Sequence, residues 1–226
     1  MYRQSGFFFL ALIGLVFLGF SKTYFLRLDQ SLPLFVHLHV LFVGCWVLLI
    51  TGQAFLIRTG ERAVHRQLGD VSFVLAPVIV ISGIYLAIQH FDQRLGSIGL
   101  TDNLEFLWWS VSHFLLFGFF YALAIANRKI PARHARYMIV ATLLFVPPTL
   151  LRVFDLFGWQ FGGLSSLASA FVVTDLLLLG LLLADLKYRR TVLPFGIGLA
   201  AFLAIQLATP LAGDSALWAS VASLLV

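Results

Sequence analysis

The sequence predicts an all-α protein, a polytopic bundle of about seven transmembrane helices that forms a single domain over residues 1–226. Composition is the first observation: 61% of the 226 residues are hydrophobic and 11% are charged, whereas a soluble domain is about half apolar and a quarter charged. Apolar stretches of the length that crosses a bilayer, about 20 residues, also recur along the chain. We therefore expect a multi-pass integral membrane protein in contact with lipid.

Seven stretches qualify as spans, and each is taken as one helix. They are residues 6–20, 35–57, 71–89, 107–125, 136–151, 164–186 and 192–209. The first lacks a small-residue cleavage pattern, so we interpret it as a retained helix and not as a signal peptide. Pro147 and Pro148 predict a kink in the fifth helix, because neither has a backbone N–H to donate. Segment 214–226 is too short to span and is expected at the interface, anchored by Trp218.

The loops predict the orientation of the chain. Basic loops follow the second, fourth and sixth spans, at residues 58–66, 128–136 and 187–190. Such loops stay in the cytoplasm, which places the N-terminus inside and the C-terminus in the periplasm of a bacterial inner membrane. The net charge of +5 is explained in the same way, and no nucleic-acid partner is expected. Cys45 is the only cysteine, so it forms no disulfide and is expected to be a packing residue.

Polar side chains inside the spans are the candidate functional groups, because lipid-facing positions do not tolerate them. His39, Trp46 and Gln53 recur every seven residues and form one stripe on the second helix. A similar order follows, with His113 and then Asn127 separated by the same fourteen residues. Helices two and three therefore look like one copy of a weak repeat whose second copy is helices four and five.

The depths of four histidines suggest haem ligation. His39 and His113 are predicted near the outer ends of their helices, and His65 and His134 near the inner ends. Two imidazoles at one depth could ligate a b-type haem, and two such pairs would carry electrons across the bilayer. The propionates would be held by arginines beside the inner pair. These are Arg62, Arg66, Arg133 and Arg136. The arrangement resembles, in topology, the ascorbate-reducible di-haem b cytochromes, in which ligands pair between helices two and four and between three and five.

The motifs themselves are more similar to those of an uncharacterised family of bacterial inner-membrane proteins. That family shows His-x6-Trp-x6-Gln, then Gly-Arg-x3-His-Arg-x-Leu-Gly, then Arg-x-Pro-x2-His-x-Arg-x-Met, and later Asp-Leu ahead of a basic turn. The corresponding residues here are His39, Trp46, Gln53, Gly60, Arg62, His65, Arg66, Leu68, Gly69, Arg128, Pro131, His134, Arg136, Met138, Asp185 and Leu186. Arg62 stands one residue later than in the pattern, and Arg128 one residue earlier. Many members continue with His-Pro, where this chain has Leu193 and Pro194, and His113 is not part of the pattern.

Each candidate residue also has a structural interpretation. The four histidines could cap helices, meet lipid phosphates or form interhelical hydrogen bonds. Histidines on the outer side could instead converge on copper or zinc. These are His37, His39, His90 and His113. Asp175 lies deep in the sixth span and should be protonated or hydrogen-bonded, with Thr174 or Gln53 as the expected partner, in a polar clasp or a proton relay.

Three functions remain open from the sequence. The leading hypothesis is a b-type haem protein that passes electrons within or across the bilayer, with quinone as a possible partner. The second is a non-catalytic accessory subunit of a larger membrane redox or photosynthetic complex. The third is a small proton-coupled transporter built around Asp175 and Gln53. Whether the chain is an enzyme stays open, although it contains no Gly-rich phosphate loop and no nucleophile elbow. Its last span also lacks the lysine of a retinal protein and the histidine of a seven-helix zinc hydrolase.

Overall fold

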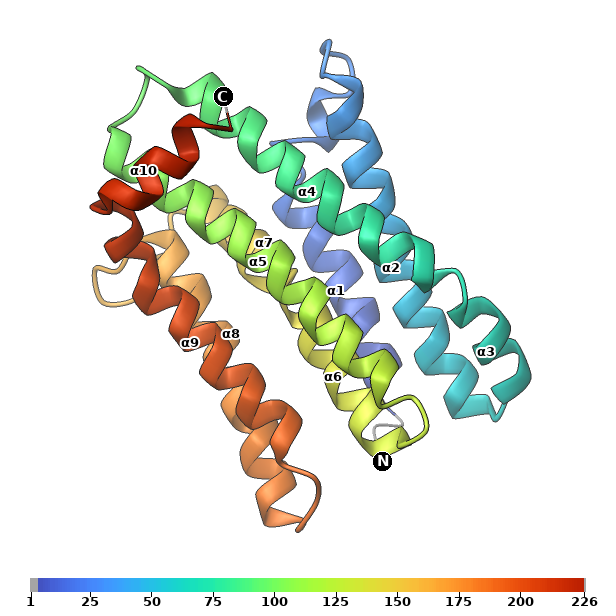
Figure 1. Ribbon diagram of the computed structural model, residues 1–226. Coiled ribbons are helices and arrows are strands. Elements are labelled where there is room, and N and C mark those ends of the chain that lie inside the picture. Colours follow the sequence, from blue (N-terminus) through green and yellow to red (C-terminus); the bar gives the residue numbers. More distant parts are fainter. Residues whose placement is uncertain (1–3, 226) are drawn as a thin grey trace. The chain divides into compact units, whose positions relative to one another are not determined.

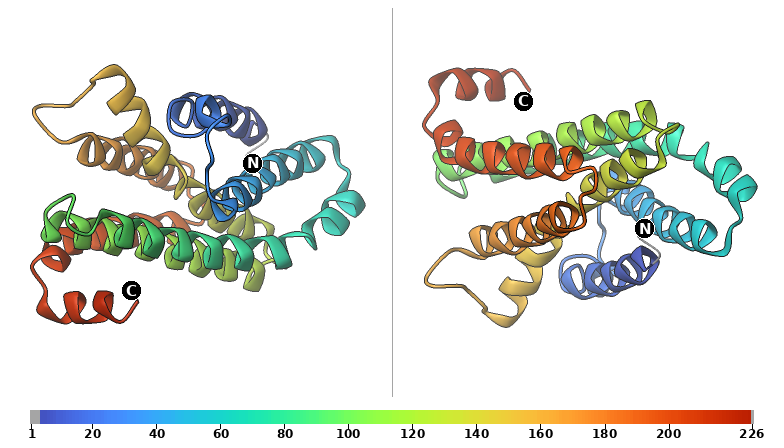
Figure 2. Two further views of the ribbon diagram at one scale, coloured as in Figure 1. Left: turned by 90° about the horizontal axis from the view of Figure 1, so that it is seen from above. Right: turned by 90° about the horizontal axis from the view of Figure 1, so that it is seen from below.

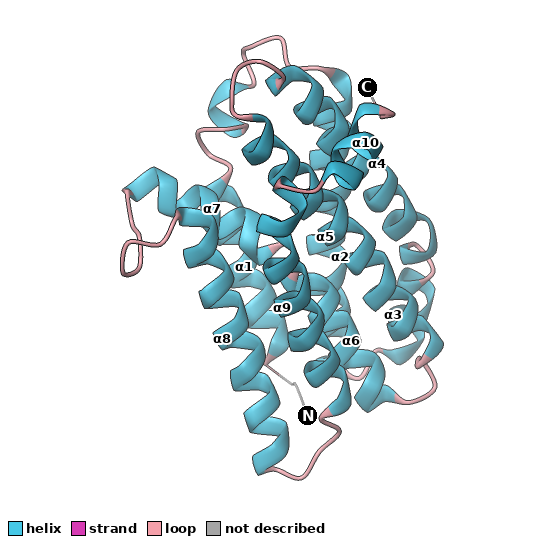
Figure 3. Ribbon diagram, turned by 60° about the vertical axis from the view of Figure 1, so that its left-hand side comes forward, coloured by secondary structure: helices cyan, strands magenta, loops and turns pink. Residues whose placement is uncertain are grey.

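The computed structural model describes residues 4–225, and helices account for nearly all of its regular structure (Figures 1 and 3). No β-strand occurs among these residues. In chain order the helices are α1 (Ser5–Gly19), the 3₁₀ turn η1 (Phe25–Arg27), α2 (Leu34–Thr59), α3 (Arg62–Gly69), α4 (Ser72–Arg94), α5 (Leu100–Ala126), α6 (Pro131–Leu143), α7 (Val146–Phe157), α8 (Ser166–Lys187), α9 (Leu193–Gly213) and α10 (Ala216–Ser223). The predicted all-α fold is confirmed.

Among the described residues, six helical segments are long and apolar enough to cross a bilayer. They are α2, α4, α5, the segment Pro131–Phe157 that comprises α6 and α7, α8 and α9. Helix α1 has 15 residues, or about 22 Å at 1.5 Å per residue, which is less than the roughly 30 Å of a hydrocarbon core. The seven predicted spans therefore correspond to six long segments and one shorter helix, in a multi-pass membrane protein.

Several helix boundaries differ from the sequence prediction, and three of the differences change how the chain is divided into helices. The basic segment after α2 does not open the next span but forms a separate short helix, α3, which follows a turn at Gly60 with φ of +89°. Helix α5 begins at Leu100, seven residues before the predicted start. The predicted kink at Pro147 and Pro148 is an interruption between Leu143 and Val146, and both prolines lie in the first turn of α7.

The chain divides into two compact units, and α4 and α8 contribute residues to both. Unit 1 comprises residues 4–79 and Phe145–Ala170. In it α1 packs against α2 and α7, and α3 packs against α2. The approach of α1 to α7 is close, because a Cβ atom on Gly19 would lie 2.7 Å from the backbone oxygen of Thr149. Arg152 of α7 extends over the ring of Phe20, with its guanidinium carbon 4.4 Å from the centroid.

Unit 2 comprises residues 80–144 and 171–225. Helix α5 packs along α6 and α9, and α6 also packs against α9. A Cβ atom on Gly198 of α9 would lie 2.9 Å from a methyl carbon of Val140, so the missing side chain allows this close packing. Helix α10 folds back from the end of α9 (Figure 2). Its Trp218 donates Nε1–H to the backbone oxygen of Leu104 at 3.1 Å, and Ala222 is fully buried.

Candidate functional site

His113 is the buried polar residue at the centre of α5. Because α5 extends from Leu100 to Ala126, His113 lies at the midpoint of the helix and not near its outer start, as the sequence had suggested. Trp109, one turn earlier, engages both of its ring nitrogens. The indole Nε1–H donates to His113 Nε2 at 3.2 Å, and His113 Nδ1 lies 3.0 Å from the backbone oxygen of Trp109. In this geometry His113 is a neutral imidazole that donates from Nδ1 and accepts at Nε2.

Asp175 of α8 and Gln206 of α9 form a second polar contact in unit 2. The amide Nε2 of Gln206 donates to Asp175 Oδ1 at 3.1 Å, and both side chains are half-buried. The partner is therefore Gln206 and neither Thr174 nor Gln53, the two residues that the sequence predicts. The carboxyl of Asp175 is thus held by a neutral group in the middle of a span.

These three residues share one level in unit 2, which we call the central layer: His113, Asp175 and Gln206. His113 lies 13 residues before the end of α5, Asp175 lies 12 before the end of α8, and Gln206 lies 13 after the start of α9. At 1.5 Å per residue each residue is therefore about 18–20 Å from the predicted inner end of its helix.

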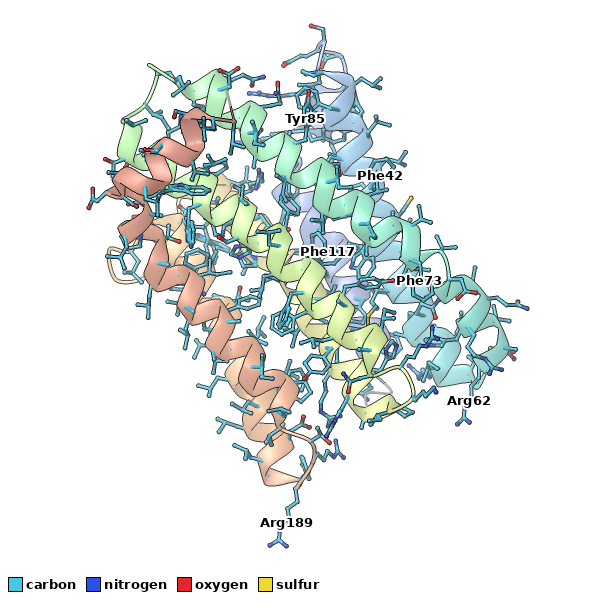
Figure 4. All side chains as sticks on the ribbon, in the orientation of Figure 1. Phe42, Arg62, Phe73, Tyr85, Phe117 and Arg189 are labelled. Atoms are coloured by element: carbon cyan, nitrogen blue, oxygen red, sulfur yellow. The ribbon has the colours of Figure 1, made fainter. Side chains whose placement is uncertain are left out.

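Aromatic rings bracket the central layer. Phe171, one turn before Asp175, lies 6.3 Å from the His113 ring, and Phe202, one turn before Gln206, lies 6.1 Å from it. Because α8 and α9 run in opposite directions, these two phenylalanines lie on opposite sides of the layer. Trp109 also contacts Phe171, with centroids 6.2 Å apart. Phe117, labelled in Figure 4, is buried one turn after His113 on α5.

Arg136 and Asp185 form a buried ion pair between α6 and α8. Arg136 Nε donates to Asp185 Oδ2 at 2.5 Å and Nη2 donates to Oδ1 at 2.8 Å, a bidentate contact. Its remaining Nη1 donates to the backbone oxygen of Ala132 at 2.6 Å. The two side chains are 0% and 1% exposed. This guanidinium is fully used inside the protein, so Arg136 does not fit the propionate-binding role that the sequence had suggested.

The inner histidines and the other arginines lie near the predicted cytoplasmic ends of the helices. His134 is half-buried, and its Nδ1 lies 2.9 Å from the backbone oxygen of Ala124 on α5. His65 is half-buried on α3. The three other predicted propionate ligands are exposed: Arg62, Arg66 and Arg133. Arg62 and the loop residue Arg189 extend away from the helices (Figure 4).

The stripe predicted on α2 is buried in unit 1. His39 and Gln53 are each 8% exposed and Trp46 is 1% exposed, as expected for polar groups that avoid lipid. Both amide atoms of Gln53 lack a hydrogen-bond partner among residues 4–225. His37 accepts or donates a hydrogen bond at Nδ1 with the hydroxyl of Tyr24, at 2.9 Å. Asn127, the proposed counterpart of Gln53, instead donates to the oxygen of Leu123 at the end of its own helix.

The structure separates the members of both predicted haem pairs into different units. His39 and His65 belong to unit 1, whereas His113 and His134 belong to unit 2. Within the described residues no group of three or more His, Cys, Asp or Glu side chains could hold a metal ion, so the copper or zinc hypothesis gains no support. Cys45 is exposed on α2 and is not the packing residue that was expected.

Two residues of the site, Trp109 and Gln206, and the pairing of Arg136 with Asp185 were not predicted from the sequence. Trp109 was overlooked because a tryptophan near a predicted helix end is ordinarily an interfacial anchor. Gln206 was overlooked although it is a polar residue within the last span. Asp185 and Arg136 appear in separate motifs, and an acid and an arginine at similar depth in two apolar helices were a usable signal for a pair.

The chain was compared with protein-family models, with curated proteins and with solved structures. No family model matches the sequence. No curated protein and no solved structure matches it either.

Proposed function

We propose that this integral membrane protein is a small proton-coupled transporter in which Asp175 binds the proton. One observation carries the proposal: a carboxyl group lies in the middle of a membrane-spanning helix and is held by an amide. Ionisable residues at such depth are costly and mark ion or proton pathways by default. A neutral partner does not fix the carboxyl in its charged form, as a cation would.

Asp185 on the same helix provides the comparison. Its carboxylate is paired with the guanidinium of Arg136 in a bidentate contact between opposite charges. Among the described residues, Asp175 forms its hydrogen bond with Gln206 and no ion pair. A primary amide can donate to a carboxylate and can also accept from a carboxylic acid. Gln206 can therefore support both protonation states of Asp175, which a proton carrier requires.

The test is proton uptake by liposomes that contain the purified chain and an internal pH-sensitive dye, with a potassium diffusion potential as the driving force. Asp175→Asn keeps a hydrogen-bonding group of the same size and should abolish uptake without loss of folded protein. Asp92→Asn removes an exposed acid from α4 and serves as the matched control, with uptake unchanged. Uptake that is as fast in Asp175→Asn as in the wild type would exclude this function.

The b-type haem hypothesis is the second candidate, and one contact favours it for the inner site. The Nδ1 atom of His134 lies 2.9 Å from the backbone oxygen of Ala124. Donation from Nδ1 to a carbonyl is the outer contact that usually orients a metal-ligating histidine, with the Nε2 lone pair turned to the metal. In this hypothesis His134 would ligate the iron and Arg133 would hold a propionate, and the haem would supply one-electron chemistry toward quinone or a larger complex.

The outer set does not fit a haem. Both ring nitrogens of His113 are engaged by Trp109, so an iron would have to replace an existing hydrogen bond. A reduced-minus-oxidised spectrum of the purified chain, expressed with added haem, tests the inner site. Absence of Soret and α bands would exclude the cytochrome hypothesis. A chain with neither haem nor proton uptake would be best explained as an accessory subunit.

A further inference from the structure

The hydrogen bonds of His113 cover the atom at which it would take up a proton. Its Nδ1–H is donated to the backbone oxygen of Trp109, so the basic lone pair of the neutral ring is on Nε2. That lone pair accepts the indole Nε1–H of Trp109 at 3.2 Å. A proton can therefore reach Nε2 only after the Trp109 hydrogen bond has opened.

Trp109 and Phe171 form an aromatic lid over one side of the central layer. Trp109 precedes His113 by one turn on α5, and Phe171 precedes Asp175 by one turn on α8. Both helices run from the predicted outer side inward, so the two rings lie on the outer side of the layer. Their centroids are 6.2 Å apart, at 68° to one another. Both rings contact His113, with centroids 5.2 and 6.3 Å from its ring, and Phe171 lies one turn before Asp175 on α8.

We infer that His113 is the group that passes protons from the outer side to Asp175. Trp109 is the positioning residue whose hydrogen bond keeps the Nε2 atom of His113 closed to protons. This inference rests on the proposed proton-coupled function. When the Trp109 hydrogen bond opens, Nε2 takes up a proton from the outer solution and the ring becomes an imidazolium. Loss of that proton to the Asp175 carboxylate restores the neutral imidazole and leaves a carboxylic acid. One proton is gained and one is released at His113, with no other reactant.

The central experiment uses the full chain in liposomes and measures the initial rate of proton uptake. Trp109→Phe keeps a ring in the lid and removes the Nε1–H donor. Uptake should rise roughly threefold, the factor for an average side-chain hydrogen bond inside a membrane protein. His113→Phe fills the same space without a proton acceptor, and uptake should fall on the order of 100-fold. The Trp109→Phe/His113→Phe double variant should be as slow as His113→Phe alone.

The matched control is Trp218→Phe. Trp218 also donates its Nε1–H to an acceptor in unit 2, the oxygen of Leu104, but it belongs to α10 and not to the lid. Its loss should leave the uptake rate unchanged. Phe171→Leu opens the lid from α8 without touching either hydrogen bond of His113, and it should also raise uptake. This variant keeps the test decisive if Trp109→Phe does not fold.

The outcomes separate this inference from the proposed function. An inactive Asp175→Asn together with unchanged rates in Trp109→Phe and His113→Phe would overturn the role of His113 and leave the function intact. A fully active Asp175→Asn, or a wild type without uptake, would overturn both. A rise in uptake that persists in the Trp109→Phe/His113→Phe variant would show that Trp109 acts only as packing.

Discussion

At the scale of residues, helix α8 carries two acids in opposite environments. Asp185 is fully buried and receives two hydrogen bonds from the guanidinium of Arg136, whereas Asp175 is half-buried and receives one from an amide. Removing one partner of a buried ion pair leaves an uncompensated charge, which is much more costly than the net contribution of the pair. Asp185 is therefore a structural group, whereas the proposed function assigns the change of charge to Asp175.

We expect Asp185→Asn and Arg136→Gln each to lower the free energy of unfolding by about 3–5 kcal/mol, because each leaves one buried partner unsatisfied. The measurement is denaturant unfolding in mixed micelles, followed by circular dichroism. Arg133→Gln, an exposed arginine on the same helix, is the control and should change stability by less than about 0.5 kcal/mol. Equal losses in Arg136→Gln and Arg133→Gln would contradict the assignment.

Individual site residues were only partly predictable from the sequence. That Asp175, His113 and the α2 stripe would avoid lipid followed from the cost of polar groups in hydrocarbon. Their hydrogen-bond partners could not be predicted from the sequence. The hydrogen bond between Asp175 and Gln206, for example, depends on how α8 and α9 face one another. Spacing along one helix does not contain that information. The contact between Trp109 and His113 could have been predicted, because residues four apart lie on the same face of a helix.

At the scale of elements, two glycines of α1 have opposite surroundings. A Cβ atom on Gly19 would lie 2.7 Å from the backbone oxygen of Thr149, whereas one on Gly14 would meet nothing within 4 Å. The contact of Gly19 involves backbone, which cannot move aside as a flexible side chain could. The packing of α1 against α7 therefore depends on this one residue.

Gly19→Ala should reduce stability by about 1–3 kcal/mol, the usual cost of overpacking. Gly14→Ala should be neutral or stabilising by up to about 1 kcal/mol, because alanine is the better helix former. Thermal unfolding of the two variants in the same detergent compares them directly. If Gly14→Ala proved the more damaging change, the close approach of α1 and α7 would be wrong.

A second prediction at this scale concerns the packing of α10 against α5. Trp218 contacts the ring of Trp108, with centroids 5.3 Å apart, and donates to Leu104. Trp218→Ala removes both contacts, worth about 2 kcal/mol together, and should raise hydrogen exchange of the α10 amides roughly thirtyfold. Leu217→Ala, at a side chain that is 78% exposed, should leave exchange unchanged. Slow exchange in Trp218→Ala would mean that other contacts hold α10.

The sequence predicted that the long helices exist but misplaced some of their ends. Hydropathy marks the part of a helix that lies in hydrocarbon, whereas a helix continues wherever its backbone hydrogen bonds continue. Helix α5 therefore extends through polar residues, including Asp102 and Glu105, before the apolar run begins. The separate helix α3 depends on the turn at Gly60, whose positive φ ends α2. A loop of basic residues did not reveal that turn.

At the scale of the whole molecule, the alternation of basic and acidic loops predicts which ends of the helices are cytoplasmic. With the basic loops inside, six long segments predict a C-terminus on the outer side whether or not the 15-residue α1 crosses the membrane. The position of the N-terminus does depend on α1. Membrane sidedness is set by the charge of the loops during insertion and not by the packing of the helices.

Single cysteines in a Cys45→Ser background test the orientation with a membrane-impermeant maleimide added to intact cells. Asp29→Cys should react from outside and Lys129→Cys only after the membrane is opened; both positions are exposed. Gln4→Cys should be protected if α1 crosses the membrane. Labelling of Lys129→Cys in intact cells would invert the proposed topology.

The division of the chain into units has a consequence for biosynthesis. Unit 1 joins residues before Ile79 to Phe145–Ala170, so 65 residues of unit 2 are made before unit 1 can be completed. Helix α1 ends at Gly19 and α7 begins at Val146, so at about 5–20 residues per second α1 waits for α7 for roughly 6–25 s. During that interval the face of α1 at Gly19 has no permanent neighbour. Ribosome-bound chains arrested before residue 145 should therefore be the species that depend most on insertase or chaperone protection.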